Sequence, residues 1–429
     1  MFDSNFIANP YETYRCLRET APLHWVDNFH RGAWLVPRYA DVSAGLTDAR
    51  LSSRRSQKLT GALPEKVQDE FDEFNRIFSK WLLFLDAPQH TRLRRFLNQG
   101  FTPQVVGWLR PRIERVVNAL LDEVTEKGKM DFMADFAHPL PVRVIAEMFG
   151  IPLNDQKNFQ IWSDAVADFM GSAQPSIETA RRAQNSLLAL TDYFRRILPE
   201  RRKNRSDDLI SLLIRLEEEG DALTEEELLA QCSLFFIAGH ETTRNLLGNG
   251  MLALVQNSEQ FALLKQNPSL ASLAVREFAR YDSPVQQVRR AAAEDFTWHG
   301  QEIKRGESVI LLIGSANRDA DKFSEPEKLN ISRSEGIGLS FGRGAHFCIG
   351  TTLANLEAEI AFIALLERLP NLKMIDDEPE WRNNITFRGL SRLRLAFQAR
   401  VAGKPANKYE PKIYNPLFEE KQRHILHTN

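Results

Sequence analysis

A long helical pattern from Thr224 to about Gln256 constrains the fold more than any other feature of this sequence. Thr224 and Glu227 form a capping-box pattern, in which each side chain can accept a hydrogen bond from a backbone N–H at a helix start. The pattern would span about 48 Å at about 1.5 Å per residue. Its middle, Leu234–Gly239, is apolar on every side, so we expect this segment to cross the protein interior. The rest of the chain must then pack around one buried helix.

Most of the remaining chain also has a helical pattern. From about residue 103 onward, apolar residues recur every three or four positions and mark one helix face: Leu109, Ile113, Val116, Val117, Leu120, Leu121 and Val124. Another helix is expected from Thr351 to Leu369. Strands are fewer: Pro22–Val26 and Ala33–Val36 predict a hairpin, and Ser308–Ile313 predicts a buried strand. The sequence thus predicts a mainly α fold with minor β and no clear internal boundary. The polar residues 401–429 are expected to form a C-terminal tail.

Charge and cysteine content exclude several classes of protein. Lysine and arginine total 55 against 57 aspartate and glutamate residues, which gives no basic surface for nucleic acid. The three cysteines, Cys16, Cys232 and Cys348, form no close pair, so neither a disulfide scaffold nor a zinc ribbon is expected. The N-terminus has no apolar export segment, and no uncharged apolar run approaches 18 residues. We therefore expect a cytoplasmic protein with no membrane span.

Cys348 has an unusual setting. It lies in the stretch Phe341–Gly350, FGRGAHFCIG, among three glycines and directly before the helix expected from Thr351. A cysteine that only packs in the core needs no such setting. A thiolate, in contrast, is favoured by backbone N–H donors and by a local positive potential. The stretch therefore indicates a reactive or metal-binding cysteine.

Polar residues interrupt the apolar part of the long helix at Ala238–Thr243, AGHETT. Burying a carboxyl group and two hydroxyls costs several kcal/mol unless they have partners. Threonine can bond to a carbonyl one turn earlier, and glycine allows a flat partner to approach the backbone. Taken alone, this stretch is better explained by a buried polar cluster with its own partners than by a functional site.

Two further pairs of charged residues share helix faces. Glu277 and Arg280 lie three residues apart, which alone is best explained by an exposed ion pair. His90 and Arg94 lie four apart and could bind one anionic group together, although taken alone they are better explained by a solvated basic helix face.

Taken together and in this order along the chain, these features resemble the cytochrome P-450 family of haem-thiolate monooxygenases, in its soluble bacterial form. The pattern Phe-Gly-x-Gly-x-His-x-Cys-x-Gly is highly specific and is matched at all six fixed positions. The resemblance extends from around Tyr11 to about Phe397 and implies one catalytic domain over residues 1–400. It also implies a haem b buried between the long helix and the cysteine loop.

The resemblance implies specific roles for the residues of these motifs. Cys348 would be the metal ligand, and its thiolate would push electron density onto the haem iron. Glu241 and Thr242 would be the acid–alcohol pair that delivers protons during oxygen activation. Haem contacts are expected from His90, Arg94, Ala238, Arg290, Phe341, His346, Cys348 and Gly350. Glu277, Arg280 and Arg333 would form a structural group near the haem. No role is assigned to His240.

The substrate region is the part that the resemblance defines least. A pocket is expected from Ile237, Val285, Gln286, Val288, Thr386 and Phe387, with Ala238 beside them. Ser53–Phe84 and Phe169–Glu178 are expected to form its lid. The substrate would be a lipophilic small molecule, possibly polyketide-like, as in secondary-metabolite biosynthesis.

The implied reaction inserts one oxygen atom from O2 by hydroxylation or epoxidation. Electrons from NAD(P)H would arrive through a ferredoxin or flavodoxin and its reductase, because no flavin or iron–sulfur domain follows the haem segment. Arg92 and Arg95 are candidate docking charges for that protein. A haem-binding module without turnover should have lost the cysteine or the acid–alcohol pair, and a peroxide-driven enzyme would not need Thr242. Both alternatives are therefore less well supported.

Overall fold

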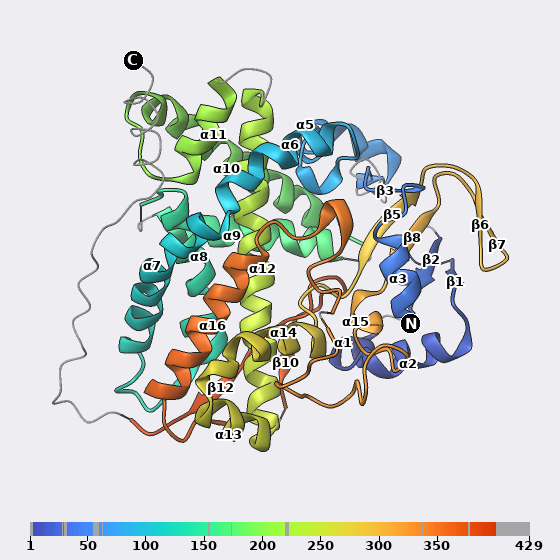
Figure 1. The fold of residues 1–429 in the computed structure, drawn as a ribbon. Coiled ribbons are helices and arrows are strands. Elements are labelled where there is room, and N and C mark those ends of the chain that lie inside the picture. Colours follow the sequence, from blue (N-terminus) through green and yellow to red (C-terminus); the bar gives the residue numbers. More distant parts are fainter. Residues whose placement is uncertain are drawn as a thin grey trace, which may run out of the picture.

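The computed structural model describes residues 3–27, 29, 32–54, 60–61, 63–152, 155–172, 174–218, 223–336, 338–375 and 378–399. Most helices pack together in one part of the molecule, and the largest sheet lies at the other side, near the N-terminus (Figure 1). The predicted tail, residues 401–429, lies outside the described residues. The described chain therefore has the mainly α character, with minor β, that the sequence predicts.

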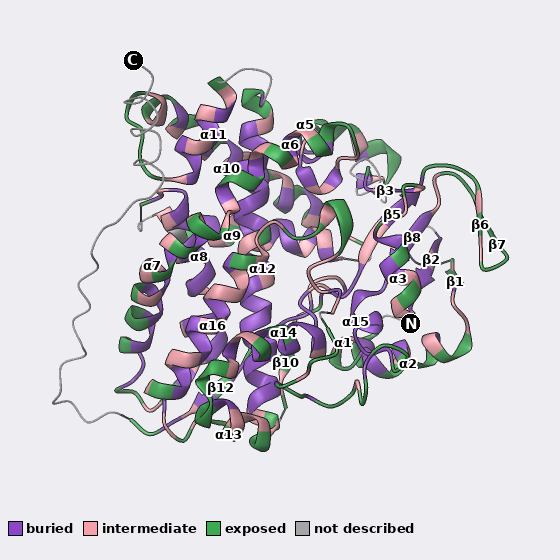
Figure 2. Cartoon of the chain, viewed as in Figure 1, coloured by how far each residue is buried: buried purple, intermediate pink, exposed green. Residues whose placement is uncertain are grey.

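The predicted long helix is confirmed as α12, Glu225–Gln256, which runs through the middle of the helical part (Figure 1). Both bonds of the capping box form: Thr224 Oγ1 accepts from the Glu227 N–H at 3.2 Å, and a Glu227 carboxylate oxygen accepts from the Thr224 N–H at 2.9 Å. Helix α12 is buried along most of its length (Figure 2). A helix buried on all sides needs partners for every polar side chain it carries.

The other α-helices surround α12 or cover the sheet. Helix α7 carries the apolar face expected from Leu109 to Leu121. Helix α16 confirms the expected Thr351–Leu369 helix and ends one residue earlier. Their bounds are α1 Ser4–Ala8, α2 Tyr11–Thr20, α3 Tyr39–Gly45, α5 Asp72–Phe78, α6 Gln89–Leu97, α7 Pro103–Asp122, α8 Pro139–Met148, α9 Gln156–Gly171, α10 Ile177–Lys203, α11 Leu209–Glu218, α13 Ser258–Gln266, α14 Ala271–Tyr281, α15 Ile313–Ala316 and α16 Thr351–Arg368.

The largest sheet has five strands in the order β1-β2-β8-β5-β3. The predicted hairpin is confirmed as β1 (His24–Val26) and β2 (Ala33–Val36), which pair antiparallel. The predicted buried strand is β8 (Ser308–Leu311); it pairs parallel with β2 and antiparallel with β5 (Val288–Ala292). The remaining strands are β3 Leu51–Ser52, β4 Lys129–Asp131, β6 Phe296–Trp298, β7 Gln301–Ile303, β9 Lys373–Met374, β10 Glu380–Trp381, β11 Leu390–Arg392 and β12 Arg394–Ala396.

Glu277 and Arg280 form a buried ion pair on α14 rather than an exposed one. Arg280 donates from two nitrogens to the two Glu277 oxygens, at 2.7 and 2.8 Å, and only 3% of Glu277 and 2% of Arg280 are exposed. Arg333 donates to the same carboxylate at 3.2 Å, and Arg280 also donates to the Asn317 carbonyl at 2.8 Å. These bonds tie α14 to the irregular chain that leads towards Cys348.

The first prediction concerns this buried network. Glu277→Ala leaves two buried guanidinium groups without their shared carboxylate, so we expect a loss of about 3–5 kcal/mol of folding free energy. Urea unfolding of the variant measures this loss.

The matched control is Glu12→Ala, which breaks the Glu12–Arg15 ion pair of the same three-residue spacing on the surface of α2. Its unfolding midpoint should stay near that of the wild type, because exposed pairs contribute little. Equal midpoints for both variants would contradict the structural role of the network.

Candidate functional site

The loop that carries Cys348 has a tightly fixed backbone. Gly342 and Gly344 have φ values of 72° and 71°, which residues with a Cβ rarely adopt. A Cβ on Gly344 would lie 2.8 Å from Thr47. The Cys348 N–H donates to the Phe341 carbonyl at 2.8 Å and closes the loop. The glycines therefore allow a turn that brings Cys348 to the start of α16.

The Cys348 sulfur lies well inside the protein, although the residue is open to solvent. Burial raises the pKa of this thiol, while the Thr351 hydroxyl, the N–H groups of Gly350 and Thr351, and the charge of Arg94 all act in the opposite direction. These opposing groups are the donors and the positive potential that stabilise a thiolate once a cation binds it. The site thus suits a metal-bound sulfur.

In the middle of its buried length, α12 has an open face that no other described part of the chain covers. Ala238 is exposed and Thr242, one turn later, is half-buried. The Thr242 hydroxyl donates to the Ala238 carbonyl at 2.8 Å. Gly239 faces α8 and not the open face, because a Cβ there would come within 2.5 Å of Ile145 on α8. The glycine therefore allows close packing of two helices, and the expectation that it admits a flat partner is wrong.

Basic side chains gather beside the cysteine loop. The rings of His90 (α6) and His346 are in contact, with centroids 4.1 Å apart and planes tilted by 41°, and His346 Nε2 lies 3.1 Å from Ser53 Oγ. Arg290 (β5) is 4% exposed, and burial lowers the pKa of its guanidinium to about 10. Within the described chain, no carboxylate lies at ion-pair distance from Arg290 or Arg94, and His90 Nε2 is buried without a hydrogen-bond partner.

These residues fit a haem. Its two propionates are carboxylates that need donors, and the buried His90 and Arg290 and the half-buried Arg94 are donors that, within the described residues, have no carboxylate at ion-pair distance. Its iron needs an axial ligand, which the Cys348 sulfur can supply. Its flat face needs small side chains, and Ala238 offers one on α12.

Glu241 is enclosed by polar partners and points away from solvent. It is 1% exposed; Arg244 Nη2 donates to one of its oxygens at 2.6 Å, and Asn245 Nδ2 to the other at 3.0 Å. Arg382, from the β10–β11 hairpin, also donates to Glu241. Arg382 continues to Asp168 on α9 at 2.7 Å. The acid expected to collect protons from solvent is therefore not in contact with solvent.

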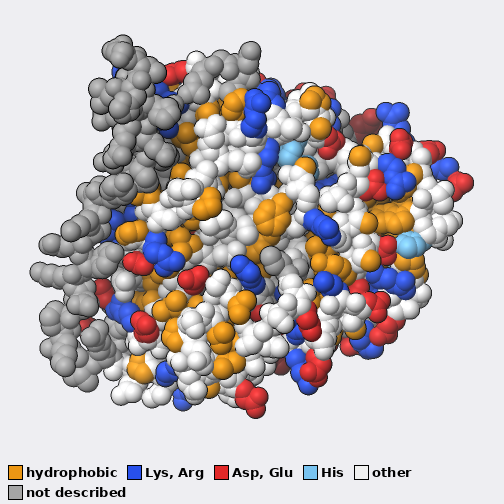
Figure 3. Space-filling model, viewed as in Figure 1, with side chains coloured by type: hydrophobic (Ala, Val, Ile, Leu, Met, Phe, Trp, Pro, Cys, Tyr) orange, Lys and Arg blue, Asp and Glu red, His pale blue; other side chains and the backbone are white. Residues whose placement is uncertain are grey.

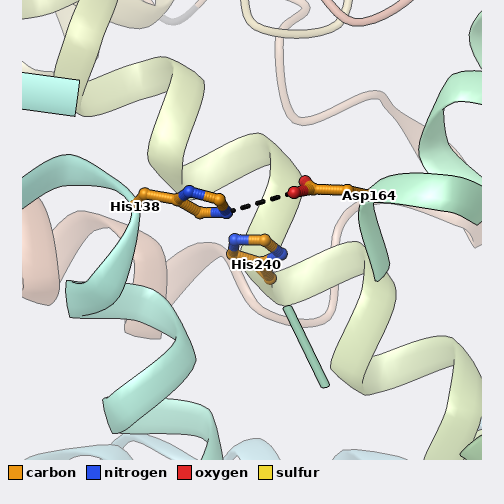
Figure 4. A group of neighbouring side chains, drawn as sticks. All are labelled: His138, Asp164 and His240. Atoms are coloured by element: carbon orange, nitrogen blue, oxygen red, sulfur yellow. Dashed lines mark ion pairs between the residues drawn. The ribbon is translucent and has the colours of Figure 1, made fainter. Parts of the chain in front are cut away.

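Two histidines and an aspartate lie next to this network (Figure 4). Asp164, on α9, accepts from Arg244 Nη1 at 2.8 Å and lies 3.5 Å from His138 Nε2. The ring of His138 stacks on that of His240 at 4.7 Å between centroids, and His240 Nδ1 lies 3.0 Å from Ser163 Oγ. His240, to which the sequence assigned no role, is thus part of a buried polar cluster.

The segments expected to form the substrate pocket come together. Val285 pairs with Phe387 in an isolated β-bridge, and the Gln287 amide donates to Thr386 Oγ1 at 3.1 Å. Ile237 is buried on α12. Gln286 differs, because its amide donates to the Ser283 carbonyl and its carboxamide lies against Gly314. This side chain fills space between segments of the fold.

The expected lid segment Ser53–Phe84 is too long. Phe71, Phe74, Phe78, Trp81 and Phe84 belong to the main hydrophobic core, and at most 2% of each is exposed. Residues so deeply packed cannot open without disrupting the core. Leu63 and Val67 belong to the same core, with 1% and 7% exposed, so among the described residues of that segment only 68–70 remain as a lid candidate; residues 55–59 and 62 lie outside the described chain.

Sequence reasoning missed the charged partners of α12. Arg244 follows Glu241 at a three-residue spacing, so its contact was open to prediction from the helix period. Arg382 lies 141 residues from Glu241, and no local signal links them. Arg92, expected as a docking charge, is instead bonded to Glu227 at the start of α12.

Comparison with known proteins gives consistent matches over almost the whole chain. Residues 57–269 and 265–399 match the family model described as Cytochrome P450. The chain is 41% identical over 398 residues to "Polyketide biosynthesis cytochrome P450 PksS" of Bacillus subtilis, covering 91% of this chain and 96% of that protein. It is 36% identical over 400 residues to "6-deoxyerythronolide B hydroxylase" of Saccharopolyspora erythraea, covering 91% and 96% of the two chains.

The fold agrees with solved structures of similar sequence. A crystal structure of P450BioI in complex with an acyl carrier protein bearing hexadec-9Z-enoic acid superposes with a TM-score of 0.86, at 37% identity over 92% of this chain and 99% of that chain. The structure of PksS gives a TM-score of 0.83 at 40% identity, over 92% and 98%. Among the described helices, none combines the length and the apolar character needed to cross a membrane.

Proposed function

The chain belongs to the cytochrome P450 family, and on that basis we propose that Cys348 is the axial ligand of its haem and that Glu241 and Thr242 deliver protons to the reaction. The enzyme is a monooxygenase of the kind that acts in secondary-metabolite biosynthesis. It uses haem b, which activates O2 with electrons supplied by a redox partner. The observation that carries the proposal is the Cys348 sulfur just before α16, on which the charge of Arg94 acts, together with the buried Arg290; within the described chain neither arginine has a carboxylate at ion-pair distance.

Several residues hold the cofactor in this proposal. His90, Arg94 and Arg290 bind the propionates as charged or polar donors, and His346 supports His90 through the contact of their rings. The Gly350 and Thr351 N–H groups donate to the sulfur and limit its negative charge. Ala238 gives room for the flat face on α12, and Phe341 packs beneath the loop.

Thr242 and Glu241 divide the proton chemistry between two faces of α12. Thr242 lies on the open face, where its hydroxyl can turn from the Ala238 carbonyl to hold a water or a reacting oxygen. Glu241 lies one residue earlier on the enclosed face and supplies the proton that Thr242 passes on. The surrounding apolar side chains exclude bulk water and protect the reactive site.

The substrate is a lipophilic small molecule, for which we propose a polyketide-like or fatty-acyl character. The proposed pocket is formed by Ile237, Val285, Val288, Thr386 and Phe387, and omits Gln286, because that side chain is committed to packing. Relatives named for polyketide biosynthesis and for a carrier-protein complex with a fatty acyl chain support this class.

We further place the docking site of the redox partner, a ferredoxin or flavodoxin, on the face shown in Figure 3. Lysine and arginine side chains gather in the upper middle of this face, where Figure 1 shows α6. Arg95 is the exposed arginine of α6 in this proposal, since Arg92 is bonded to Glu227. A cytoplasmic location, as expected from the sequence, would place the enzyme with such partners.

The second prediction tests Cys348. Cys348→Ala removes the thiolate, so the reduced protein with carbon monoxide should lose the absorption band that gives the family its name. Difference spectra of wild type and variant measure it. The control is Cys16→Ala, a change at the exposed cysteine of α2, which should leave the band intact. A band that survives in Cys348→Ala would exclude this ligand.

The third prediction tests Thr242. Thr242→Ala should keep haem and substrate binding but consume reductant without equivalent product, releasing hydrogen peroxide instead. Thr243→Ala, a buried neighbour on the same helix, is the matched control and should keep its coupling. Product, peroxide and NAD(P)H consumption are measured together. Undiminished product per reductant in Thr242→Ala would show that another group passes the proton.

The fourth prediction tests the lid. Amides of residues 68–70 and 174–178 should exchange hydrogen faster than those of Leu229–Leu247 and should slow when a ligand binds. Residues 71–84 should be protected like the core in both states. Hydrogen exchange followed by mass spectrometry resolves these segments. Equal protection in all segments, with and without ligand, would refute a moving lid.

A further inference from the structure

Each arginine that holds Glu241 also holds a second carboxylate, and both second carboxylates lie on α9. Arg244 bonds Glu241 through Nη2 and Asp164 through Nη1, at 2.6 and 2.8 Å. Arg382 bonds Glu241 through Nη1 and Asp168 through Nη2. Two guanidinium groups are therefore shared among three carboxyl groups.

This sharing lowers the cost of protonating Glu241. A buried guanidinium that loses its only carboxylate is strongly destabilised. Here Arg244 keeps Asp164 and Arg382 keeps Asp168 when Glu241 becomes neutral. Glu241 can thus gain and lose a proton while both arginines stay paired.

None of the groups that donate hydrogen bonds to Glu241 can transfer a proton to it. Its partners are two guanidinium groups, which do not give up protons in proteins, and the amide of Asn245. The proton must come from another acid that is in contact with solvent. Asp164 is such an acid, because 30% of its side chain is exposed and it shares Arg244 with Glu241. Asp168 is less suited, since Arg382 occupies one of its oxygens and Arg182 the other.

The groups around Asp164 let it carry a proton near neutral pH. Burial, the charge of Glu241 and that of Asp168 raise its pKa, Arg382 lowers it, and the result is about 7. Besides Arg244, the other titratable groups that face it are His138 and His240. Burial lowers the pKa of His138 to about 4 and that of His240 well below its usual value, so both rings stay neutral. Neutral rings add no positive charge that would drive the proton off Asp164.

The cluster in Figure 4 is poorly arranged for a metal ion. The rings of His138 and His240 are stacked and parallel to within 8°. The lone pair of a ring nitrogen lies in the plane of its ring, and one ion cannot lie in both of these planes. Arg244 Nη1 also lies 2.8 Å from Asp164 and 3.3 Å from His138, where its charge repels a cation. The ligand atoms of the three residues lie within 4.8 Å of one another. One water at about 2.8 Å from each atom fits that spacing.

We propose that Asp164 is the residue through which solvent protons reach Glu241, and that the two carboxyl groups share one proton across Arg244. The Asp164 O–H bond breaks, a Glu241 oxygen gains the proton, and the negative charge moves to Asp164. Arg244 then pairs with Asp164, which regains a proton from solvent. This inference rests on the proposed role of Glu241 and Thr242 and adds the step that precedes it.

The first test reads the proton directly, without turnover. Infrared difference spectra of the substrate-free holoenzyme, with aspartate labelled by carbon-13, should show a protonated carboxyl band that disappears as the pH rises through about 7. Asp164→Asn should lack this band, and Asp168→Asn should keep it. A titrating band that remains in Asp164→Asn would overturn the assignment.

The second test measures proton supply in the cycle. Asp164→Asn should bind haem and substrate normally but turn over more slowly, on the order of tenfold or more, with a larger solvent deuterium effect. The wild-type rate should fall above about pH 7, where Asp164 loses its proton, and this break should vanish in Asp164→Asn. Asp168→Asn should keep the break but move it to lower pH, because the charge of Asp168 raises the pKa of Asp164.

The outcomes separate this inference from the role of Thr242. If Thr242→Ala uncouples the enzyme while Asp164→Asn keeps the wild-type rate and isotope effect, the relay stands and entry through Asp164 is wrong. If Asp164→Asn shows the expected slowing while Thr242→Ala remains coupled, proton entry stands and the role of Thr242 is wrong.

Discussion

Charge pairing along α12 is the constraint on which the rest of this structure depends. A helix of 32 residues crosses the core while carrying Gln231, Glu241, Arg244, Asn245 and Asn249, all buried. Each polar side chain is held by a different neighbour: Gln231 bonds the chain before α6, Arg244 bonds α9, and Asn249 bonds carbonyls after α14 and in the C-terminal segment. These hydrogen bonds offset the cost of burying the polar side chains of α12, and they also hold the neighbouring elements in place.

The same helix separates two environments that the chemistry needs. Its open face presents small or hydroxyl side chains, Ala238 and Thr242, towards the proposed haem, while its enclosed face keeps Glu241 among charges. The proton donor and the reacting site are then one residue apart in sequence but in different surroundings. Helix α9 contributes the carboxylates of Asp164 and Asp168 to the enclosed face, so the position of α9 decides how the two arginines beside Glu241 are paired.

Local patterns predicted the parts of the fold that local interactions decide. The capping box at Thr224 and the pattern around Cys348 depend on near neighbours in sequence. The first correctly predicted a helix start, and the second a loop shaped by glycines. Gly239 and Gln286 were misjudged, because their packing partners, Ile145 and Gly314, are distant in sequence. The same limit hid Arg382: an ion pair across 141 residues leaves no trace in periodicity or spacing. Arg382 is thus the partner of Glu241 that only the structure provides.

The central claim is that the Cys348 sulfur binds the haem iron at the start of α16. X-ray absorption at the iron edge of the purified ferric protein measures the atoms bound to iron directly. The account predicts one sulfur atom among nitrogen ligands in the wild-type protein, and no sulfur in Cys348→His. A wild-type spectrum with only nitrogen or oxygen ligands, or a sulfur ligand that persists in Cys348→His, would contradict it.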